Sequence, residues 1–387
     1  MKDLYHLFLR RIAHFQVEHP FMTILLLGLL TAAVWGGVGH VRTVASLEQM
    51  MPKDVEEIKA FNVLRDNQLG QDIIAVVIQT DRQSIDGIID IRDKAVYDYV
   101  KGLRGDLSTQ TDVLAVYDMT DVVEQGLTDE QYKEAVRDPQ ARDRLSQFIN
   151  DDYTTTVMLI TTDVSADDSR MAGLTSQVKE YVDAAGHPPG IEVRLTGTPV
   201  IQQRLAELIQ HDRKSTQWIS TLLVFLITML IFGTFTSALV PIIVVTVSVN
   251  WLYGTMGYTN LPISTLAGGV AAMVVGIGID FAIHIMNKFK YERKKGLSLK
   301  QAVEMAVVDT GTALTATALT TISAFLAFLI GVMPEMGRFG LLMAIGISYA
   351  LMFSVFGLPA LLVAEEKLIY RFQKRMKFGV EGELHLV

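Results

Sequence analysis

The sequence predicts a polytopic α-helical membrane protein with six transmembrane helices and one α/β domain inserted between helices 1 and 2. Half of the 387 residues are hydrophobic, and none is a cysteine. Several uncharged apolar runs are long enough to cross a bilayer, which takes about 20 residues in a helix. One long polar segment between two of these runs alternates β-branched stretches with amphipathic ones, as a water-soluble domain does.

Residues 1–19 are predicted to form a cytoplasmic or interfacial N-terminal helix. Its apolar side chains recur on one face, at Leu4, Leu7, Phe8, Ile12 and Phe15. Such a helix can lie on the membrane surface, although a basic flank that only fixes orientation would have the same composition. Residues 20–40 follow as transmembrane helix 1, because their apolar run is too long for a cleaved leader peptide.

Residues 41–214 are predicted to be an extracytoplasmic α/β domain. Its expected strands are Asp72–Thr80, Val113–Tyr117, Tyr153–Thr162 and Ile191–Leu195, and its expected helices are Ile85–Leu103 and Arg170–Ala185. This order gives two βαβ units, which indicates a ferredoxin-like sandwich (βαβ-βαβ). Between the units, Asp121–Asn150 is expected to be a polar, mostly helical insertion.

Residues 215–364 are predicted to contain transmembrane helices 2 to 6, and residues 365–387 form a cytoplasmic tail. The stretch 215–279 has no charged residue and is too long for two spans. Glycine and proline divide it at 233–241 and 257–262. The expected spans are Trp218–Phe235, Leu239–Met256, Pro262–Met286, Thr310–Val332 and Phe339–Ala364.

The distribution of charge predicts the orientation in the membrane. Residues 41–214 hold 31 of the 42 acidic residues but only 19 of the 34 basic ones. Lysine and arginine gather in the N-terminal flank, the loop after the fourth span and the tail, whereas the opposite short loops hold only Arg338. Under the positive-inside rule, both termini are cytoplasmic in a multi-pass cytoplasmic-membrane protein. The acidic domain then faces the periplasm or the extracellular space, and no basic stripe suits a nucleic acid.

One charged pair interrupts the apolar fourth span. Gly268, Ala272, Gly276, Asp280 and His284 recur every four residues and so share one face of the helix. The small residues predict a helix-packing seam. An acid at the centre of a membrane helix costs about 2.5–3.5 kcal/mol on insertion scales, so it is expected to be buried against other helices or to face a wet cavity.

We expect Asp280 to carry a proton, because intramembrane acids are functional by default. A structural hydrogen bond between helices is the alternative for this residue. His284 either relays protons or lies at headgroup level near the cytoplasmic end of the span.

Hydroxyl groups crowd the fifth span and complete the predicted proton relay, with Thr317, Thr320 and Thr321 as its members. At least one of these hydroxyls is expected to reach Asp280. For any single threonine, a hydrogen bond to its own backbone is the more ordinary expectation. Glu304 and Asp309, which precede this span, are expected to be solvated charges.

Enzyme chemistry finds no support in the sequence. No Walker A, HExxH or GxSxG motif occurs, and Phe281 stands where a dinucleotide-binding loop starting at Gly276 needs its third glycine. His187 and His211 lack metal-ligand spacing. We therefore expect no cofactor and no metal, and a proton gradient as the energy source.

Five stretches together resemble the resistance–nodulation–division superfamily, most closely its mycobacterial-membrane-protein-large (MMPL) branch of hydrophobe and amphiphile exporters. They are GIGIDFAIHIMNKFKYERKKG (276–296), TALTATALTTISAFLAFLIGVMP (312–334), IGISYALMFSVFGLPALL (345–362), SLEQMMPKD (46–54) and LTGTPVIQQRL (195–205). The resemblance covers nearly the whole chain.

This resemblance implies a proton antiporter that exports lipids or other hydrophobic or amphiphilic molecules, with Asp280 as proton carrier and residues 41–214 as a porter-like domain. Two features depart from the family pattern. Phe281 replaces the tyrosine that commonly follows the acid, and the chain has one six-span half where a typical member has two. A homodimer or higher homo-oligomer would restore the missing half, and a different half-chain is the alternative.

Two other functions remain open from the sequence. A lipid-binding or sterol-sensing protein of the same superfamily would use the same bundle without pumping. A protein-export accessory subunit would also resemble half of a superfamily member.

Overall fold

The computed structural model describes residues 2–43, 51–52, 55–56, 58–59, 63, 73–81, 87–122, 137, 140, 143–144, 146–162, 169–264 and 266–369. The chain divides into two compact units. The membrane unit comprises Met1–Val44, Gln49–Met51 and Leu208–Val387, and the α/β unit comprises Ala45–Glu48 and Pro52–Glu207. Each unit has its own hydrophobic core.

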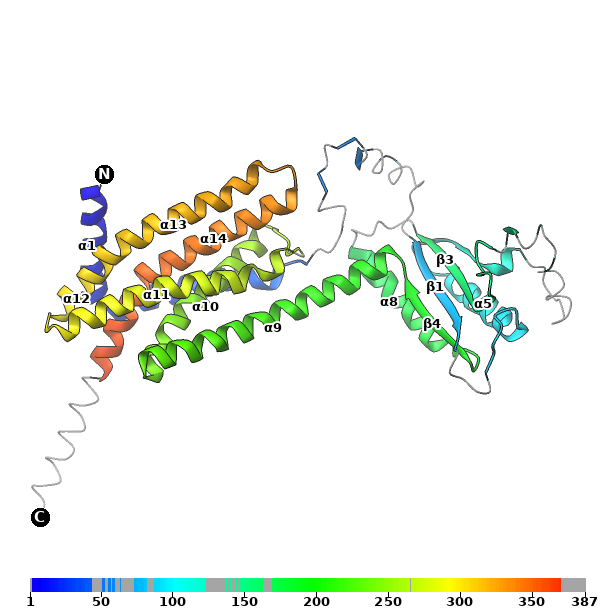
Figure 1. Cartoon of the computed structure of the whole chain (residues 1–387), viewed down its shortest axis with the longest axis horizontal. Helices are drawn as coiled ribbons and strands as arrows, with labels where there is room; N and C mark the ends of the chain where they lie inside the picture. Colours follow the sequence, from blue (N-terminus) through cyan, green and yellow to red (C-terminus); the bar gives the residue numbers. More distant parts are fainter. Residues whose placement is uncertain are drawn as a thin grey trace, which may run out of the picture. The chain divides into compact units, whose positions relative to one another are not determined.

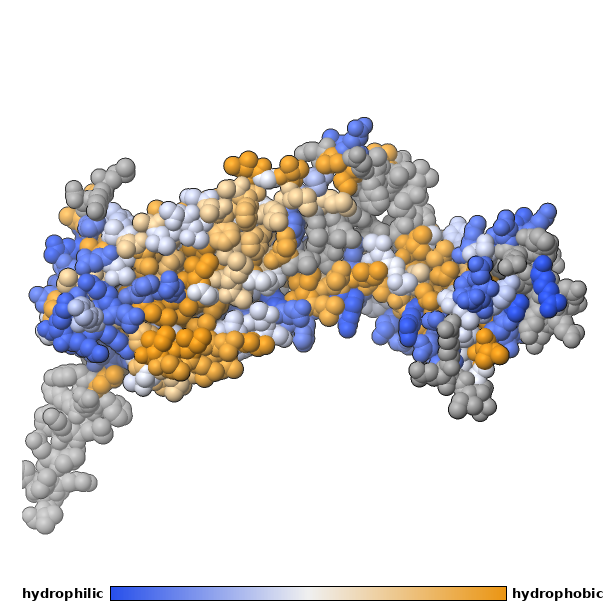
Figure 2. Space-filling view, viewed as in Figure 1, coloured by the Kyte–Doolittle hydropathy of each residue, from blue (hydrophilic) through white to orange (hydrophobic). Residues whose placement is uncertain are grey.

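Six helices of the described chain are long and apolar enough to cross a membrane, which confirms the predicted number of spans. They cover Pro20–His40, Thr198–Phe232, Phe235–Tyr258, Ala267–Lys294, Leu299–Ile330 and Pro334–Ile369. Figure 2 shows apolar residues massed over these helices, with polar residues gathered at the end of the bundle.

The helix α14 (Pro334–Phe356) is the centre of the membrane unit. It packs along α10 (Phe235–Tyr258), α11 (Val270–Lys294) and α13 (Gly311–Leu326), as Figure 1 shows. On the outer side, α2 (Pro20–Trp35) packs on α10. The spans that contain α10, α11 and α14 are more than half buried, whereas those that contain α2, α9 and α13 lie mostly exposed.

The long helix α9 (Thr198–Phe232) runs without a break into the second span, as the sequence predicts. It ends where Gly233 takes a φ of +67°, a left-handed conformation that favours glycine. The predicted end of this span at Phe235 is therefore wrong, because Phe235 already begins α10. Pro241 lies inside α10 and does not interrupt it.

The N-terminal helix α1 (Lys2–Glu18) packs against α12 (Leu299–Met305) and the following π-helix η4 (Ala306–Thr310). Its buried positions are Leu9, Ala13 and Gln16. The predicted apolar face stays open, since Leu4, Leu7, Phe8 and Phe15 are about half exposed or more. The helix thus docks on the bundle through one side and keeps an apolar side free.

Four antiparallel strands form the sheet of the α/β unit, in the order β2-β3-β1-β4. They are β1 (Ile73–Thr80), β2 (Val113–Tyr117), β3 (Thr155–Thr162) and β4 (Ile191–Thr196). Helix α5 (Lys94–Leu107) follows β1, and α8 (Ser169–Ala184) follows β3. The strands begin and end within two residues of their predicted bounds. Each helix thus connects two strands of the same sheet.

The largest boundary error in the α/β unit concerns α5, which begins nine residues after its predicted start at Ile85. Asp93 is its N-cap and accepts a hydrogen bond from the backbone N–H of Ala95 at 2.9 Å. An aspartate in this role fixes the helix start more firmly than apolar periodicity does. The predicted helical insertion at Asp121–Asn150 lies largely outside the described residues.

Candidate functional site

Asp280 lies near the middle of α11, on the exposed face of that helix. Its Oδ1 is 3.4 Å from Nε2 of His284, one turn later. The two side chains are 65% and 57% exposed. The helix α11 belongs to a candidate membrane span. The side chains of Asp280 and His284 therefore face the surroundings of the bundle and not its packed interior.

The opposite face of α11 is tightly packed. A Cβ added to Gly278 would lie 2.9 Å from the Cβ of Ala350 on α14, so only glycine permits this approach. Phe281 is 3% exposed and belongs to the core. The residue that replaces the family's tyrosine therefore turns away from the face that carries the acid.

The predicted seam at Gly268, Ala272 and Gly276 is not a close helix–helix contact within one copy of the chain. A Cβ added to Gly276 would meet nothing within 4 Å, and one added to Gly268 would touch only Ile209, at 3.6 Å. The period of four places these residues on the same face of α11 as Asp280, but α11 packs into the bundle through its opposite face. Close packing in this copy uses Gly278 instead.

The threonines of α13 bond their own backbone. Thr317 donates to the carbonyl of Ala313 at 3.2 Å, and Thr320 and Thr321 both donate to the carbonyl of Thr317, at 2.7 and 3.0 Å. Within the described chain no hydrogen bond joins them to Asp280. The threonines lie on α13, which packs along α14 as α11 does.

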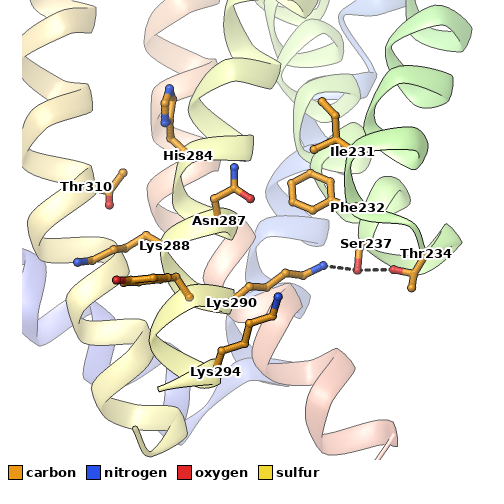
Figure 3. Close-up of a pocket in the computed structure, with 11 residues that line it drawn as sticks. Ile231, Phe232, Thr234, Ser237, His284, Asn287, Lys288, Lys290, Lys294 and Thr310 are labelled. Carbon is orange, nitrogen blue, oxygen red and sulfur yellow. Dashed lines mark hydrogen bonds between the residues drawn. The ribbon is translucent and has the colours of Figure 1, made fainter. Parts of the chain in front are cut away.

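A polar cavity of about 840 Å³ opens beside His284 (Figure 3). Its walls come from the end of α9, the start of α10, the last turns of α11, and η4. The lining residues are Ile231, Phe232, Thr234, Ser237, His284, Asn287, Lys288, Lys290, Tyr291, Lys294 and Thr310. Lys290 donates to Ser237 Oγ at 2.5 Å and lies 4.7 Å from the centre of the Phe232 ring.

Ion pairs lock the helices together at the same end of the bundle. Glu292, only 3% exposed, bonds Lys288 at 3.0 Å, and Lys288 also reaches Asp309 at 3.5 Å. Glu304 bonds both Arg10 and His14 of α1. The expectation that Glu304 is a solvated charge is therefore wrong, because α1 covers it. Asp309 remains about half exposed but is paired.

The α/β unit encloses an acid of its own. Asp118, just after β2, is fully buried, and its Oδ1 accepts from the backbone N–H of Thr120 at 2.7 Å and lies 3.7 Å from Arg104 Nη1. Arg104 also bonds Asp121 at 2.6 Å. Burial raises the pKa of Asp118, although the hydrogen bonds of Thr120 and the charge of Arg104 oppose the rise.

The sequence reading missed one further acid, Glu335 in the first turn of α14. It is 3% exposed, and its Oε1 accepts from the backbone N–H of Leu266 at 3.4 Å. The sequence signal is Pro334 followed by an acid, a pattern typical of a helix start. Among the described residues, no group of three or more histidines and acids could hold a metal ion.

Comparisons with known proteins agree on one family. The sequence model of the MMPL family matches residues 49–377. A membrane protein of Methanocaldococcus jannaschii is 31% identical over 375 residues, which is 95% of this chain and 97% of that protein. The sulfolipid-1 exporter MmpL8 of Mycobacterium tuberculosis is 27% identical over 65% of this chain, and the trehalose monomycolate exporter MmpL3 of Mycolicibacterium smegmatis is 27% identical over 41%.

The fold is similar to that of the hedgehog release protein Disp from the water bear Hypsibius dujardini, with a TM-score of 0.61 at 12% identity over 94% of this chain. The chain spans 49% of the Disp chain, 25% of MmpL8 and 17% of MmpL3.

Proposed function

The chain belongs to the MMPL family, and from that premise we propose that it exports lipids or other hydrophobic or amphiphilic molecules across or out of the cytoplasmic membrane, driven by proton entry. The names of the relatives support this class of substrate, since MmpL3 and MmpL8 are named as exporters of a trehalose lipid and a sulfolipid. The pair of Asp280 and His284 in the middle of a span supports the energy source.

In this proposal Asp280 takes a proton from outside and releases it inside. One charge moved through 100 mV supplies about 2.3 kcal/mol, and a pH difference adds to that. His284 is close enough to exchange the proton with the carboxylate, at 3.4 Å. It also lines the cavity that leads toward the basic end of the bundle (Figure 3), which gives the proton a polar exit.

A second copy of the chain is part of the proposal. An ionisable side chain that faced hydrocarbon would carry a large cost, and Asp280 is 65% exposed in one copy. Gly276 leaves open space on that face, so another helix can approach closely. A homodimer or higher homo-oligomer that covers this face would place the acid between helices, and a different half-chain could do the same.

The α13 threonines fit such an interface as acceptors. The protons of Thr317, Thr320 and Thr321 are already donated to backbone carbonyls. Toward Asp280 these hydroxyls can then act only as acceptors, and a carboxyl group donates only when it is protonated. Against a partner's α11 they would favour the proton-loaded state of Asp280.

We also propose an orientation. The basic end of the bundle, with both termini, lies in the cytoplasm, and the α/β unit lies in the periplasm or outside the cell as a ferredoxin-like, porter-like domain. The positive-inside rule supports this placement.

Substitution of Asp280 in proteoliposomes with an imposed pH gradient tests the proposal. Asp280→Asn should abolish lipid-stimulated proton uptake, measured with an internal pH-sensitive dye, while leaving the bundle folded because the side chain is exposed. Asp212→Asn, a change of the same kind at an exposed acid of α9, is the matched control. Normal uptake by Asp280→Asn would show that another group carries the proton. No lipid-stimulated uptake by the wild type would instead favour a lipid-binding or sensing protein without a pump.

The non-pumping alternative keeps one observation in its favour. Phe281 lies in the core, so no phenol sits beside the acid on its open face. A chain that binds lipid without turnover would show the same lipid content with and without an uncoupler. A protein-export accessory subunit would retain lipid-independent association with a translocation partner.

A further inference from the structure

The polar cavity at the basic end lies where three membrane spans terminate together. Lys294 is the last residue of α11, Phe232 is the last of α9, and Thr234 precedes the first residue of α10. Side chains from all three elements face into it (Figure 3). A cavity at the ends of membrane helices lies at the depth of the lipid headgroups.

Two ammonium groups in this cavity have no acidic partner. Among the described residues no carboxylate lies within ion-pair distance of Lys290 or Lys294, while the third lysine, Lys288, is fully engaged by Glu292 and Asp309. Glu365 acts on Lys290 only from beyond that distance. Lys290 is half buried and bonds just a hydroxyl, Ser237 Oγ, beside the Phe232 ring. A desolvated cation with neutral partners is the arrangement that an anion completes.

The hydrogen-bonding groups around these lysines match a phosphate diester. Ser237 accepts from both Lys290 and Thr234, at 2.5 and 2.7 Å, which holds the Lys290 ammonium in place. Lys294, Asn287 and Tyr291 also line the cavity and are exposed, and each carries a group that can donate to further oxygens. Lysine binds phosphate as a point charge and needs no fixed geometry.

The apolar surface next to the cavity identifies a lipid as the source of the phosphate. Ile227, Leu230 and Ile231 of α9 are 57%, 84% and 55% exposed. Figure 2 shows the apolar surface that includes the end of α9 directly bordering the basic end of the unit. Free phosphate would leave this surface unused, whereas the acyl chains of a phospholipid would cover it while its headgroup filled the cavity.

We propose that this cavity binds the headgroup of an anionic phospholipid, with Lys290 and Lys294 as the charged contacts. Only 6% of the span formed by α9 is buried, so this helix packs little against the rest of the bundle. The lipid would bridge α9 to the packed helices α10 and α11. Basic pockets between membrane helices are known headgroup sites. The inference needs only the membrane unit and does not rest on proton coupling.

Lipid retention by the full-length protein tests this site. Protein reconstituted in nanodiscs of equal parts phosphatidylglycerol and phosphatidylcholine would be released into the gas phase and its bound lipids counted by native mass spectrometry. Wild type should keep phosphatidylglycerol preferentially. Lys294→Gln should lower that preference about fivefold. The double variant of Lys290→Gln and Lys294→Gln should lower it by about a further factor of five.

The double variant Lys295→Gln with Lys300→Gln is the control, since it loses the same charge at the same end but outside the cavity. Its preference should stay within twofold of wild type, and millimolar inorganic phosphate should not displace the lipid. Equal retention by the Lys290 and Lys294 variants, equal binding of phosphatidylcholine, or displacement by inorganic phosphate would each overturn the proposal. Because Lys294 is exposed, its single variant stays informative even if the double variant unfolds.

Discussion

Asp118 in the α/β unit and Asp280 in the membrane unit have opposite surroundings. Asp118 in the α/β unit is fully buried, with a backbone N–H and Arg104 as fixed partners from the same unit. Asp280 in the membrane unit is 65% exposed, and its one close partner among the described residues is His284. The enclosed acid takes its partners from its own unit, whereas the open acid has only His284 close to it within the described residues.

This difference separates structure from function in physical terms. A buried charge with internal partners stabilises or strains its own unit, and its loss shows as a change in the free energy of unfolding. An exposed charge contributes little to folding in water but cannot remain uncovered in hydrocarbon. Substitution of Asp118 is therefore expected to change the free energy of unfolding. Substitution of Asp280 is expected to change transport and the association of copies.

Removing the basic side chain beside each acid should separate the two acids most widely. Arg104→Met leaves Asp118 and Asp121 without their cation and should lower the free energy of unfolding of the α/β unit by about 3 kcal/mol. Hydrogen exchange of the β1 and β3 backbone in the full-length protein measures this loss. His284→Gln should leave that exchange unchanged, and equal effects of the two variants would erase the distinction.

Two glycines that are two residues apart, on opposite faces of α11, sharpen the comparison within that helix. Gly278→Val forces a side chain against Ala350 and should destabilise the membrane unit by about 2 kcal/mol, seen as a lower midpoint of thermal unfolding in detergent. Gly276→Val meets open space and should leave that midpoint unchanged while reducing the fraction of dimer. If Gly276→Val destabilised the single copy instead, the open face would be a packed one.

The histidine beside the open acid should affect rate and not folding. His284→Gln keeps a hydrogen-bonding side chain but cannot hold a proton, so lipid-stimulated proton uptake in proteoliposomes should fall about tenfold, less than for full loss of a general acid. The control is His187→Gln, an exposed histidine of the α/β unit. A histidine that only lies at headgroup level would give uptake within error of wild type.

The smallest expected effect is the pH dependence of the enclosed acid. Because burial raises the pKa of Asp118, its folded form holds the proton to higher pH than the unfolded chain does. The stability that protonation provides is complete below the unfolded pKa of about 3.9 and is lost as pH rises through the folded value. Asp118→Asn should therefore gain stability relative to wild type between pH 4 and pH 7. A constant difference across that range would mean that Arg104 fully compensates burial.

The sequence predicted most of the fold because its signals are local. Six apolar runs give six spans, and β-branched stretches locate all four strands, with β2 placed at Val113–Tyr117 to the residue. The start of α5 was missed because a single capping aspartate decided it. The pairing of Glu304 was missed because its partners, Arg10 and His14, come from the far end of the chain.

The geometry of the site was predictable only in part, for a similar reason. A period of four places Asp280, His284 and Gly276 on one face, but periodicity cannot say which face of α11 meets α14. That choice depends on the fit of Gly278 against Ala350 of α14. Gly278 is only two positions from Gly276, and both are glycines in apolar sequence. The unpaired Lys290 was equally hidden, since its surroundings come from α9 and α10.

The protonation of Asp280 itself is the most direct test of the whole account. Infrared difference spectra of the reconstituted protein, recorded while the pH is lowered, should show the carbonyl stretch of a protonated carboxylic acid. The account predicts that one component of this band is lost in Asp280→Asn and kept in Asp212→Asn. A band of equal strength in Asp280→Asn would show that another group carries the proton and would contradict it.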